Sequence, residues 1–316
     1  MEATYAVLGT DARALELRTR QLSPERDQVL VRLLACGICR GDLLDFPRDR
    51  PEAAAFGHEP VGQVVACGPW VESLKEGDWV VGGVDGAFAT YALGRESGLY
   101  RVSASLAEAG SLAEPLKCVT TIVRAAAPDC GDTVAVVGCG FMGLAALAAL
   151  GGGWQGQLVA VDPEPERRRL ALELGATHAV DPGGEDAVSA LRGLTGGRGA
   201  DVAIDLVGNT PATTLAGRLL RTRGRLIAAA GYLPQDEGME LYLRALTLHC
   251  TPPAFSPDPA DDWRRAVAAM ESGRFPLARL LTHRFPLSGI QQAFETALEG
   301  AAVGYLKGIV VNDLAE

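Results

Sequence analysis

"TVAVVGCGFMG" occupies residues 133–143 and joins an unbroken apolar run to three glycines in the spacing G-x-G-x-x-G. Such a run predicts a buried strand, and the apolar residues after it predict a helix. In that context the first glycine permits a tight turn, the second lets the backbone approach a pyrophosphate, and the third lets the helix lie close to the strand. The stretch therefore predicts a dinucleotide-binding turn whose contact residues are Gly138, Gly140, Phe141, Met142 and Gly143.

An acidic residue closes the next apolar run, QLVAVD (157–162), which reads as the second strand of the same sheet. A carboxylate there, at Asp162, can accept hydrogen bonds from the adenosine ribose and repel a 2′-phosphate, which favours NAD over NADP. Arg167 is the counter-evidence, because a nearby arginine can accept the additional phosphate. We expect NAD to be the cofactor.

Apolar runs and amphipathic segments alternate from about residue 132 onward, which predicts a parallel sheet covered by helices on both faces. The segment before residue 115 is different: short strand-like runs are separated by Gly, Pro and Asp, as in an irregular barrel or sandwich. PPAFSPDPADD (252–262) reads as a linker or loop. The chain is therefore expected to be an α/β protein of two domains.

Composition restricts the possible partners and location. The chain has 316 residues, 48% hydrophobic residues and a formal net charge of −10. A net negative charge disfavours nucleic acid and anionic membrane surfaces, which need a basic patch, and leaves a small molecule as the expected partner. Seven cysteines and no visible signal peptide indicate free thiols or metal ligands in a reducing compartment, so we expect a cytoplasmic protein.

A second motif, GHEPVGQVVACGPWV, occupies residues 57–71. His58 and Glu59 supply an imidazole and a carboxylate, and both groups are suited to zinc. Upstream, the run ACGIC places Cys36 and Cys39 in the spacing Cys-x-x-Cys. That pair can be half of a zinc knuckle, a redox couple or two small buried thiols.

The second motif, in the spacing G-H-E-x2-G-x5-G-x2-V, resembles the signature of the zinc-containing alcohol dehydrogenases of the medium-chain dehydrogenase/reductase superfamily. Further motifs follow in that family's order, namely AEPL (113–116), the glycine motif, GRGADVAIDLVG (197–208) and LTHRFPL (281–287). The resemblance implies a GroES-like, β-rich catalytic domain and a Rossmann domain with a doubly wound parallel sheet. We expect the catalytic domain at residues 1–114 and 255–316, and the Rossmann domain at 115–254.

The resemblance also implies one catalytic zinc ion per chain. Cys39 matches the first ligand of the family and His58 the second. Glu114 stands where the polyol and threonine dehydrogenase branch carries a glutamate ligand. Glu59 is the adjacent carboxylate that can exchange onto the metal. Asp42 matches the acid that accepts the other N–H of the ligand histidine and so fixes the ring.

Four weaker assignments complete the expected site. Arg40 and Lys307 match positions that contact the cofactor pyrophosphate, with a surface cation as the alternative for each. Cys118, four residues after Glu114, is a possible substitute ligand. Cys36 is then not a ligand and is expected to be a buried thiol.

Two departures from the family pattern affect the expected chemistry. Residues 76–94 contain no cysteine, so the lobe that binds a second, structural zinc in many relatives is missing. Gly41 replaces the serine or threonine whose hydroxyl starts the proton relay, and Leu44 replaces the relay histidine of some alcohol dehydrogenases. A water, Glu59 or a hydroxyl of the substrate could take the proton instead.

These expectations together describe a zinc-dependent oxidoreductase. It would transfer a hydride between a secondary alcohol or polyol, or the matching ketone, and NAD(H), and it would form a homodimer or homotetramer. Two alternatives remain open. One is an NADPH-dependent biosynthetic reductase of the same fold. The other is a catalytically silent nucleotide-binding protein.

Overall fold

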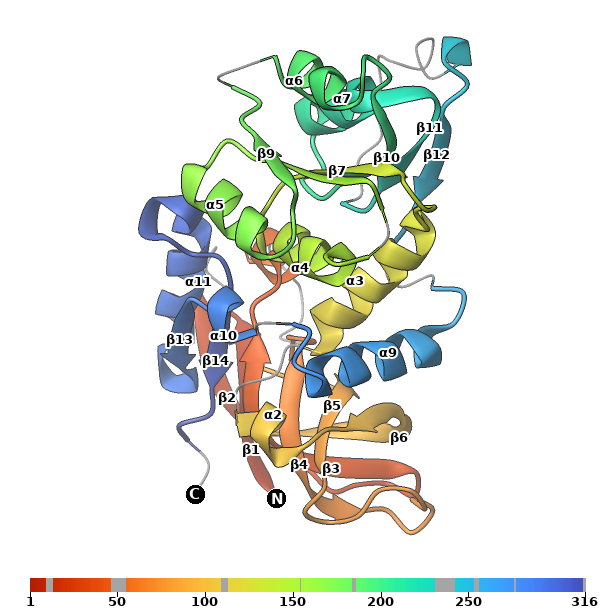
Figure 1. Cartoon of the computed structure of the whole chain (residues 1–316). Coiled ribbons are helices and arrows are strands. Elements are labelled where there is room, and N and C mark those ends of the chain that lie inside the picture. Colours follow the sequence, from red (N-terminus) through yellow and green to blue (C-terminus); the bar gives the residue numbers. More distant parts are fainter. Residues whose placement is uncertain are drawn as a thin grey trace. The chain divides into compact units, whose positions relative to one another are not determined.

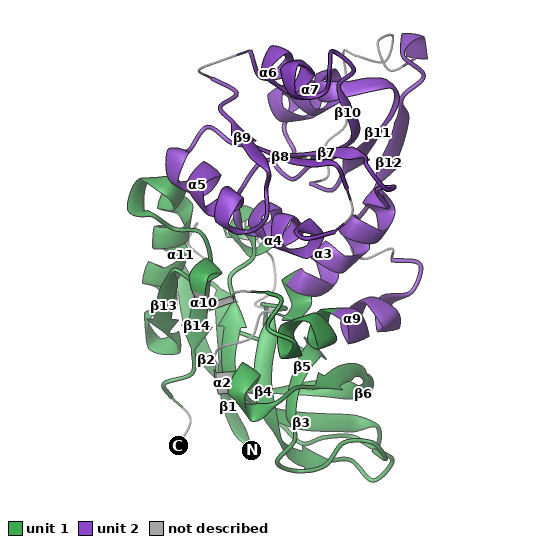
Figure 2. Ribbon diagram, in the orientation of Figure 1, with its two compact units in different colours: residues 1–115, 266–316 green, residues 116–265 purple. Residues whose placement is uncertain are grey.

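The computed structural model describes residues 1–9, 14–46, 55–108, 113–153, 155–183, 186–230, 242–252, 256–275 and 277–314. The chain divides into two compact units, here called unit 1 (residues 1–115 and 266–316) and unit 2 (residues 116–265), which Figure 2 colours separately. No helix among the described residues is long and apolar enough to cross a membrane.

The second division between the two compact units lies at residues 265/266, within a helix. The first turn of the helix α9 (Pro259–Glu271) forms ion pairs with Arg124 of α3 (Ala113–Ala126), and the paired residues belong to unit 2. Arg124 Nη1 lies 2.9 Å from Asp261 Oδ2 and 2.6 Å from Asp262 Oδ1. Residues 259–262, which the sequence suggested as part of a linker, therefore begin a helix.

Unit 2 holds a six-stranded sheet in the order β12-β11-β10-β7-β8-β9, in which every neighbouring pair is parallel. Its strands are β7 (Thr133–Val137), β8 (Gln157–Val161), β9 (His178–Val180), β10 (Ala200–Asp205), β11 (Leu220–Ala228) and β12 (Thr247–Cys250). Its further helices are α4 (Phe141–Leu150), α5 (Pro165–Glu173), α6 (Ala187–Leu194) and α7 (Thr210–Leu219). Helices α4 and α5 cover one face and α6 and α7 the other (Figure 1), which confirms the doubly wound parallel sheet.

The helices and strands of unit 2, and their burial, follow the sequence pattern closely, with two exceptions in secondary structure. Every residue of β7 and β10 is buried, and α4 is buried over most of its surface, as expected for segments that are apolar all round. Residues 220–222 read as the end of a helix, but they begin β11 because Leu220 pairs with Ala200. The strand β12 was not expected, because all four of its residues are exposed at the edge of the sheet.

Unit 1 is β-rich and confirms the expected GroES-like sheet domain. Besides a two-stranded sheet of β1 and β2, it has a six-stranded sheet in the order β13-β14-β3-β4-β5-β6. The strand β6 also pairs with β3, so that β3 to β6 form a closed set. The strands of unit 1 are β1 (Glu2–Leu8), β2 (Leu15–Gln21), β3 (Gln28–Gly37), β4 (Pro60–Cys67), β5 (Trp79–Val84), β6 (Tyr91–Arg101), β13 (His283–Pro286) and β14 (Gly308–Val311). Its helices are α1 (Arg40–Asp45), α2 (Ala104–Glu108), α10 (Leu277–Leu280) and α11 (Ile290–Glu299), with 3-10 turns η2 (Leu287–Gly289) and η3 (Gly300–Val303).

The register of three strands in unit 1 positions the candidate site. The strand β3 is antiparallel to both β4 and β14, with Cys36 opposite Pro60 and Gly37 opposite Ile309. The end of β3 and the starts of β4 and β14 therefore meet at one edge of the sheet. Residues that directly follow β3 or precede β4 and β14 are brought together there, although they are far apart in the chain.

Candidate active site

Three side chains at this edge of the sheet form a group that could hold a metal ion. One donor atom each from Cys39, His58 and Glu59 lies within 4.8 Å of the others. Cys39 comes just after β3 and caps the N-terminus of α1, and the other two residues directly precede β4. A thiol, an imidazole and a carboxylate are the donor types that zinc accepts in proteins.

Asp42 connects two members of this group and is itself buried. Its Oδ2 accepts a hydrogen bond of 2.8 Å from the Cys39 main-chain N–H, and its Oδ1 lies 3.4 Å from His58 Nδ1. The hydrogen bond that the His58 ring donates to Asp42, with a further one to the Cys39 sulfur, raises the pKa of His58 to about 11. Because Asp42 faces Nδ1, it orients the ring so that Nε2 is the nitrogen left for a metal.

Glu59 and Lys307 form a buried ion pair. The Lys307 ammonium donates hydrogen bonds to Glu59 Oε1 at 2.8 Å and to the Ile38 carbonyl oxygen at 2.9 Å, and it lies 2.6 Å from Glu59 Oε2. Burial raises the pKa of Glu59, and the charge of Lys307 opposes that rise. The side chain of Lys307 is only 6% exposed. It is therefore not a surface cation, because its position just before β14 places it beside the end of β3. Its contact with the cofactor pyrophosphate stays a prediction.

Glu114 begins α3 and belongs to unit 1. It is close enough for its charge to raise the pKa of Glu59, yet its carboxylate is not part of the group of three donors. Cys118, one turn further along α3, is buried and also lies outside that group. The role of Glu114 as a metal ligand stays a prediction.

The arrangement of donors fits a zinc ion. Among the described residues, Glu59 Oε2 is a buried oxygen that makes no hydrogen bond of acceptable geometry, despite its closeness to Lys307. Such an oxygen can serve as a ligand without breaking a hydrogen bond. Three protein ligands with a fourth position open are typical of catalytic zinc sites, whereas structural sites are closed.

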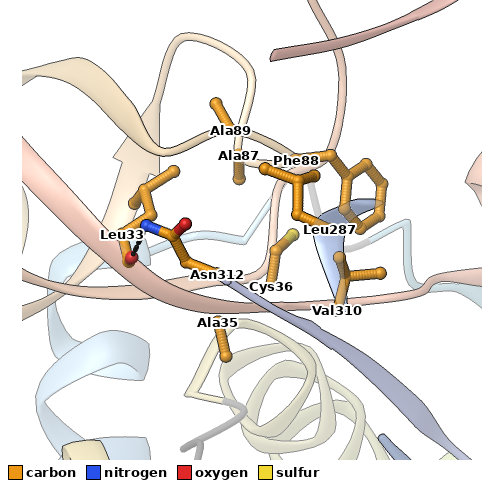
Figure 3. A pocket seen from close by; sticks show the side chains of 9 residues that line it. All are labelled: Leu33, Ala35, Cys36, Ala87, Phe88, Ala89, Leu287, Val310 and Asn312. Carbon is orange, nitrogen blue, oxygen red and sulfur yellow. Dashed lines mark hydrogen bonds between the residues drawn. The ribbon is translucent and has the colours of Figure 1, made fainter. Parts of the chain in front are cut away.

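Cys36 is separate from the group, as expected for a buried thiol. It is 2% exposed, and its Sγ faces a small cavity of about 10 Å³ (Figure 3). Apolar side chains such as Phe88 and Leu287 line that cavity, and Asn312 is the polar side chain among them. Burial raises the pKa of the Cys36 thiol well above its usual value, which disfavours the thiolate that a metal ligand requires.

The position of Gly41 borders open space. Among the described residues, a Cβ added there would meet only the Cys39 Sγ within 4 Å, at 3.8 Å. The main-chain N–H of Gly41 donates to that sulfur at 3.5 Å. Leu44, on the same short helix, is 56% exposed, and Arg40 is exposed at its start. Positions 41 and 44 therefore carry no polar side chain that could replace the relay hydroxyl or the relay histidine of the relatives.

In unit 2 the glycine motif lies between β7 and α4, next to the loop that follows β10. Gly138 has a φ of +91°, and a Cβ there would clash with Val207. A Cβ at Gly143 would overlap the carbonyl oxygen of Gly138, so only glycine lets α4 approach the turn. Among the described residues, a Cβ at Gly140 would meet nothing within 4 Å, so there is room at this N-cap of α4, where a phosphate could bind. Phe141, the first residue of α4, is largely buried.

Asp162 follows β8 and is 2% exposed. Its Oδ2 accepts the N–H of Cys139 at 2.7 Å, and its Oδ1 accepts the N–H of Glu164 at 2.9 Å. It therefore holds the glycine-rich turn against the loop after β8, a role that the sequence did not indicate. Arg167 Nη1 lies 4.0 Å from Asp162 Oδ2. The next residue, Arg168, was not singled out by the motif and bonds to the Asp162 carbonyl oxygen at 2.8 Å.

Two family models match the chain. The alcohol dehydrogenase GroES-like domain matches residues 25–118, and the zinc-binding dehydrogenase domain matches residues 138–252. An L-threonine 3-dehydrogenase of Caldanaerobacter subterraneus subsp. tengcongensis is 30% identical, covering 87% of this chain and 89% of that enzyme. An erythritol/L-threitol dehydrogenase of Mycolicibacterium smegmatis is 28% identical and covers 92% of each chain.

The solved structures agree in fold. A zinc-binding dehydrogenase of Sinorhizobium meliloti, crystallised with NADP, superposes with a TM-score of 0.86 at 25% identity, covering 98% of this chain and 99% of that one. A GroES-like unit with a Cys-His-carboxylate group and a Rossmann unit with a glycine-rich turn define a zinc-type nicotinamide-dependent dehydrogenase. The chain belongs to the zinc-containing alcohol dehydrogenase family of the medium-chain dehydrogenase/reductase superfamily. It is an oxidoreductase that acts on CH–OH groups.

Proposed function

We propose that the protein oxidises a polyol or a related secondary alcohol, or reduces the matching ketone, by exchanging a hydride with NAD(H). The observation that carries this proposal is the group of donor atoms from Cys39, His58 and Glu59. The relatives named above act on threonine and on erythritol or L-threitol, substrates that carry a second polar group beside the reacting hydroxyl.

Each residue of the site has a part in this chemistry. Cys39, His58 and one carboxylate, from Glu59 or Glu114, would hold one zinc ion per chain, which supplies a Lewis acid that polarises the substrate oxygen. Asp42 keeps the His58 ring in its ligand orientation. The carboxylate of Glu59 is also positioned to take up the proton that alcohol oxidation releases.

The open space at Gly41 supports a substrate with more than one hydroxyl. In the part of the chain that the structure describes, no side chain occupies the place beside Cys39 where relatives carry the relay hydroxyl. A second hydroxyl of the substrate can enter this space and pass on the proton from the reacting hydroxyl. A simple alcohol cannot supply that group.

A substrate screen tests the proposed function. We expect polyols and threonine-like amino alcohols to reduce NAD, which is measured by the absorbance of the NADH formed. Simple alcohols of equal chain length should give lower rates. Activity with NADPH and a ketone but with no alcohol would favour the biosynthetic reductase instead. No turnover of any alcohol or ketone by zinc-loaded protein would favour the silent nucleotide-binding protein.

The preference for NAD is supported by the carboxylate of Asp162 at the end of β8. We expect Asp162→Asn to shift the ratio of kcat/KM values toward NADP by about tenfold or more, because the charge that repels a 2′-phosphate is removed while the size is kept. Steady-state kinetics with both cofactors measures this ratio. Arg167→Ala is the matched control and should weaken any NADP activity. A wild-type enzyme that already prefers NADP would contradict the NAD assignment.

We also propose a homodimer formed through β12. This strand is at the sheet edge, all four of its residues are exposed, and the exposed Tyr242 and Leu243 precede it. An unpaired strand edge beside apolar side chains favours pairing with a second copy. Light scattering should give twice the chain mass. A tetramer would require a second interface, and a monomer would contradict the proposal.

A cytoplasmic location is also part of this proposal. All seven cysteines are free thiols, which is typical of a reducing compartment.

A further inference from the structure

The motif GRGADVAIDLVG (197–208) holds two buried aspartates, near the beginning and at the end of β10. At the beginning, Asp201 Oδ2 accepts the N–H of Thr133 at 2.8 Å, and its Oδ1 accepts a hydrogen bond from Arg221. These bonds join β10 to its neighbours β7 and β11. Asp205, at the other end of the strand, has no part in the chemistry assigned so far.

Asp205 acts as the acceptor of three hydrogen bonds. Its Oδ1 accepts the main-chain N–H groups of Val207 at 2.9 Å and of Gly208 at 3.2 Å. Its Oδ2 accepts the hydroxyl of Thr213, which is fully buried on α7. Several donors around one buried side chain suit a carboxylate, because that group has only acceptors. Asp205 therefore fastens the loop 206–208 to the end of β10 and to α7.

The loop 206–208 lies directly against the glycine-rich turn. The N–H of Leu206 donates to the Val137 carbonyl oxygen at 3.0 Å, at the end of β7. A Cβ added at Gly138 would lie 2.5 Å from Val207 Cγ2 and 3.5 Å from the Val207 nitrogen, so this glycine is in close contact with the loop. The position of Val207 therefore limits where the turn can lie.

This contact lies where a parallel sheet of this kind binds its ligand. The chain continues from β7 to β8 on one side of β7, and it places β10 on the other side. Dinucleotides bind at the carboxyl ends of the strands beside such a change of direction. Because β7 and β10 are parallel, with Asp205 opposite Val137, the loop 206–208 and the glycine-rich turn border the expected dinucleotide site together.

We propose that Asp205 is a positioning residue of the dinucleotide site, which holds the loop 206–208 in place so that Val207 supports the glycine-rich turn. This inference rests on the proposed use of a nicotinamide dinucleotide. Asp205 acts through the loop and does not touch the cofactor. Its contribution is geometric, since a carboxylate charge would repel the diphosphate rather than attract it.

Asp205→Ala tests the inference by removing the acceptor from the loop. The affinity for NADH, measured by fluorescence titration well below the melting temperature, should fall about tenfold or more, as expected when hydrogen bonds to a charged group are lost. The affinity for NADPH should fall by the same factor, because the glycine-rich turn binds the diphosphate that both cofactors share. In the cofactor-free protein, amide hydrogen exchange should become faster at residues 206–208 and at 138–143.

Asp201→Ala is the matched control, since Asp201 is a buried aspartate of the same strand that accepts a main-chain N–H at the opposite end. This variant should have a lower melting temperature but the NADH affinity of the wild type, with unchanged exchange at 138–143. Asp205→Asn should retain most of the NADH affinity. Its amide oxygen can still accept both loop N–H groups, and its NH2 group can donate to the Thr213 hydroxyl.

Thr213→Val is a milder second variant, which removes the anchor of Asp205 on α7 and serves if Asp205→Ala does not fold. It should weaken NADH binding and accelerate exchange at 206–208. Wild-type NADH affinity in either of these two variants would overturn the inference and leave the proposed function standing. An equal loss of affinity in Asp201→Ala, or a loss in Asp205→Asn as large as in Asp205→Ala, would also overturn it. A wild-type chain that binds neither NADH nor NADPH would overturn the proposed function itself.

Discussion

Cys39→Ala is expected to abolish zinc binding and to lower kcat/KM by about 1,000-fold or more. The substitution removes the thiolate ligand from the group of three donors and leaves one imidazole and one carboxylate. Charge stabilisation by a metal ion is worth several kcal/mol in the transition state, and each 1.4 kcal/mol is a factor of ten in rate. Elemental analysis should find close to one zinc per wild-type chain and none in the variant.

Cys36→Ala is the matched control for this prediction. Cys36 stands three residues earlier in the same Cys-x-x-Cys pair, but its thiol faces the cavity of Figure 3. The variant should keep its zinc and its activity and lose only about 1 kcal/mol of stability, since a small side chain is removed beside a small cavity. Loss of zinc in both variants would contradict the separation of the two cysteines, and two zinc ions per wild-type chain would contradict the missing structural lobe.

Lys307→Met is expected to destabilise the metal-free protein by about 3–5 kcal/mol, because it leaves the buried carboxylate of Glu59 without its partner. The two side chains are 6% and 1% exposed, so water cannot replace the lost ammonium. Denaturant unfolding monitored in the absence of cofactor measures this effect. Lys307→Arg should lose less, because it keeps the charge.

The double variant Lys307→Met with Glu59→Gln provides the control. Removing the charge of Glu59 as well should recover a large part of the lost stability, since no unpaired charge remains buried. If Lys307 instead contacted the cofactor pyrophosphate, as its position in the family suggested, Lys307→Met would weaken cofactor binding and leave the metal-free protein as stable as the wild type. That result would contradict the buried ion pair.

Local patterns in the sequence were sufficient for the architecture. The apolar run 133–137 and the glycines after it predicted a buried strand, a turn and a helix, because strand burial and helix approach depend on residues that adjoin in the chain. The alternation that follows predicted the parallel sheet for the same reason. At 220–222 and 259–262 the local pattern was misleading, because pairing with β10 and an ion pair with α3 decided those segments.

In the candidate site, too, some residues were predictable from the sequence and others were not. Cys39, His58, Glu59 and Asp42 were identifiable because short motifs around them resemble those of a known family, and the same resemblance implied that Cys36 is a buried thiol. By contrast, Lys307 stands 248 residues from Glu59, and no spacing connects them. Asp162 was identified for its charge, but its bonds to two loops follow from the fold around it.

By itself, the sequence determined the fold class, the glycine-rich turn and the types of metal donor, because each depends on neighbours within a few residues. Only the tertiary structure decided that Lys307 is a buried partner of Glu59 and that, among the described residues, no side chain but Cys39 comes close to the position of a Cβ at Gly41. The physical reason is the antiparallel register of β3 with β4 and β14, which brings the end of one strand against the starts of two others. Contacts of this kind depend on pairing between distant segments, and local sequence patterns carry no direct record of that pairing.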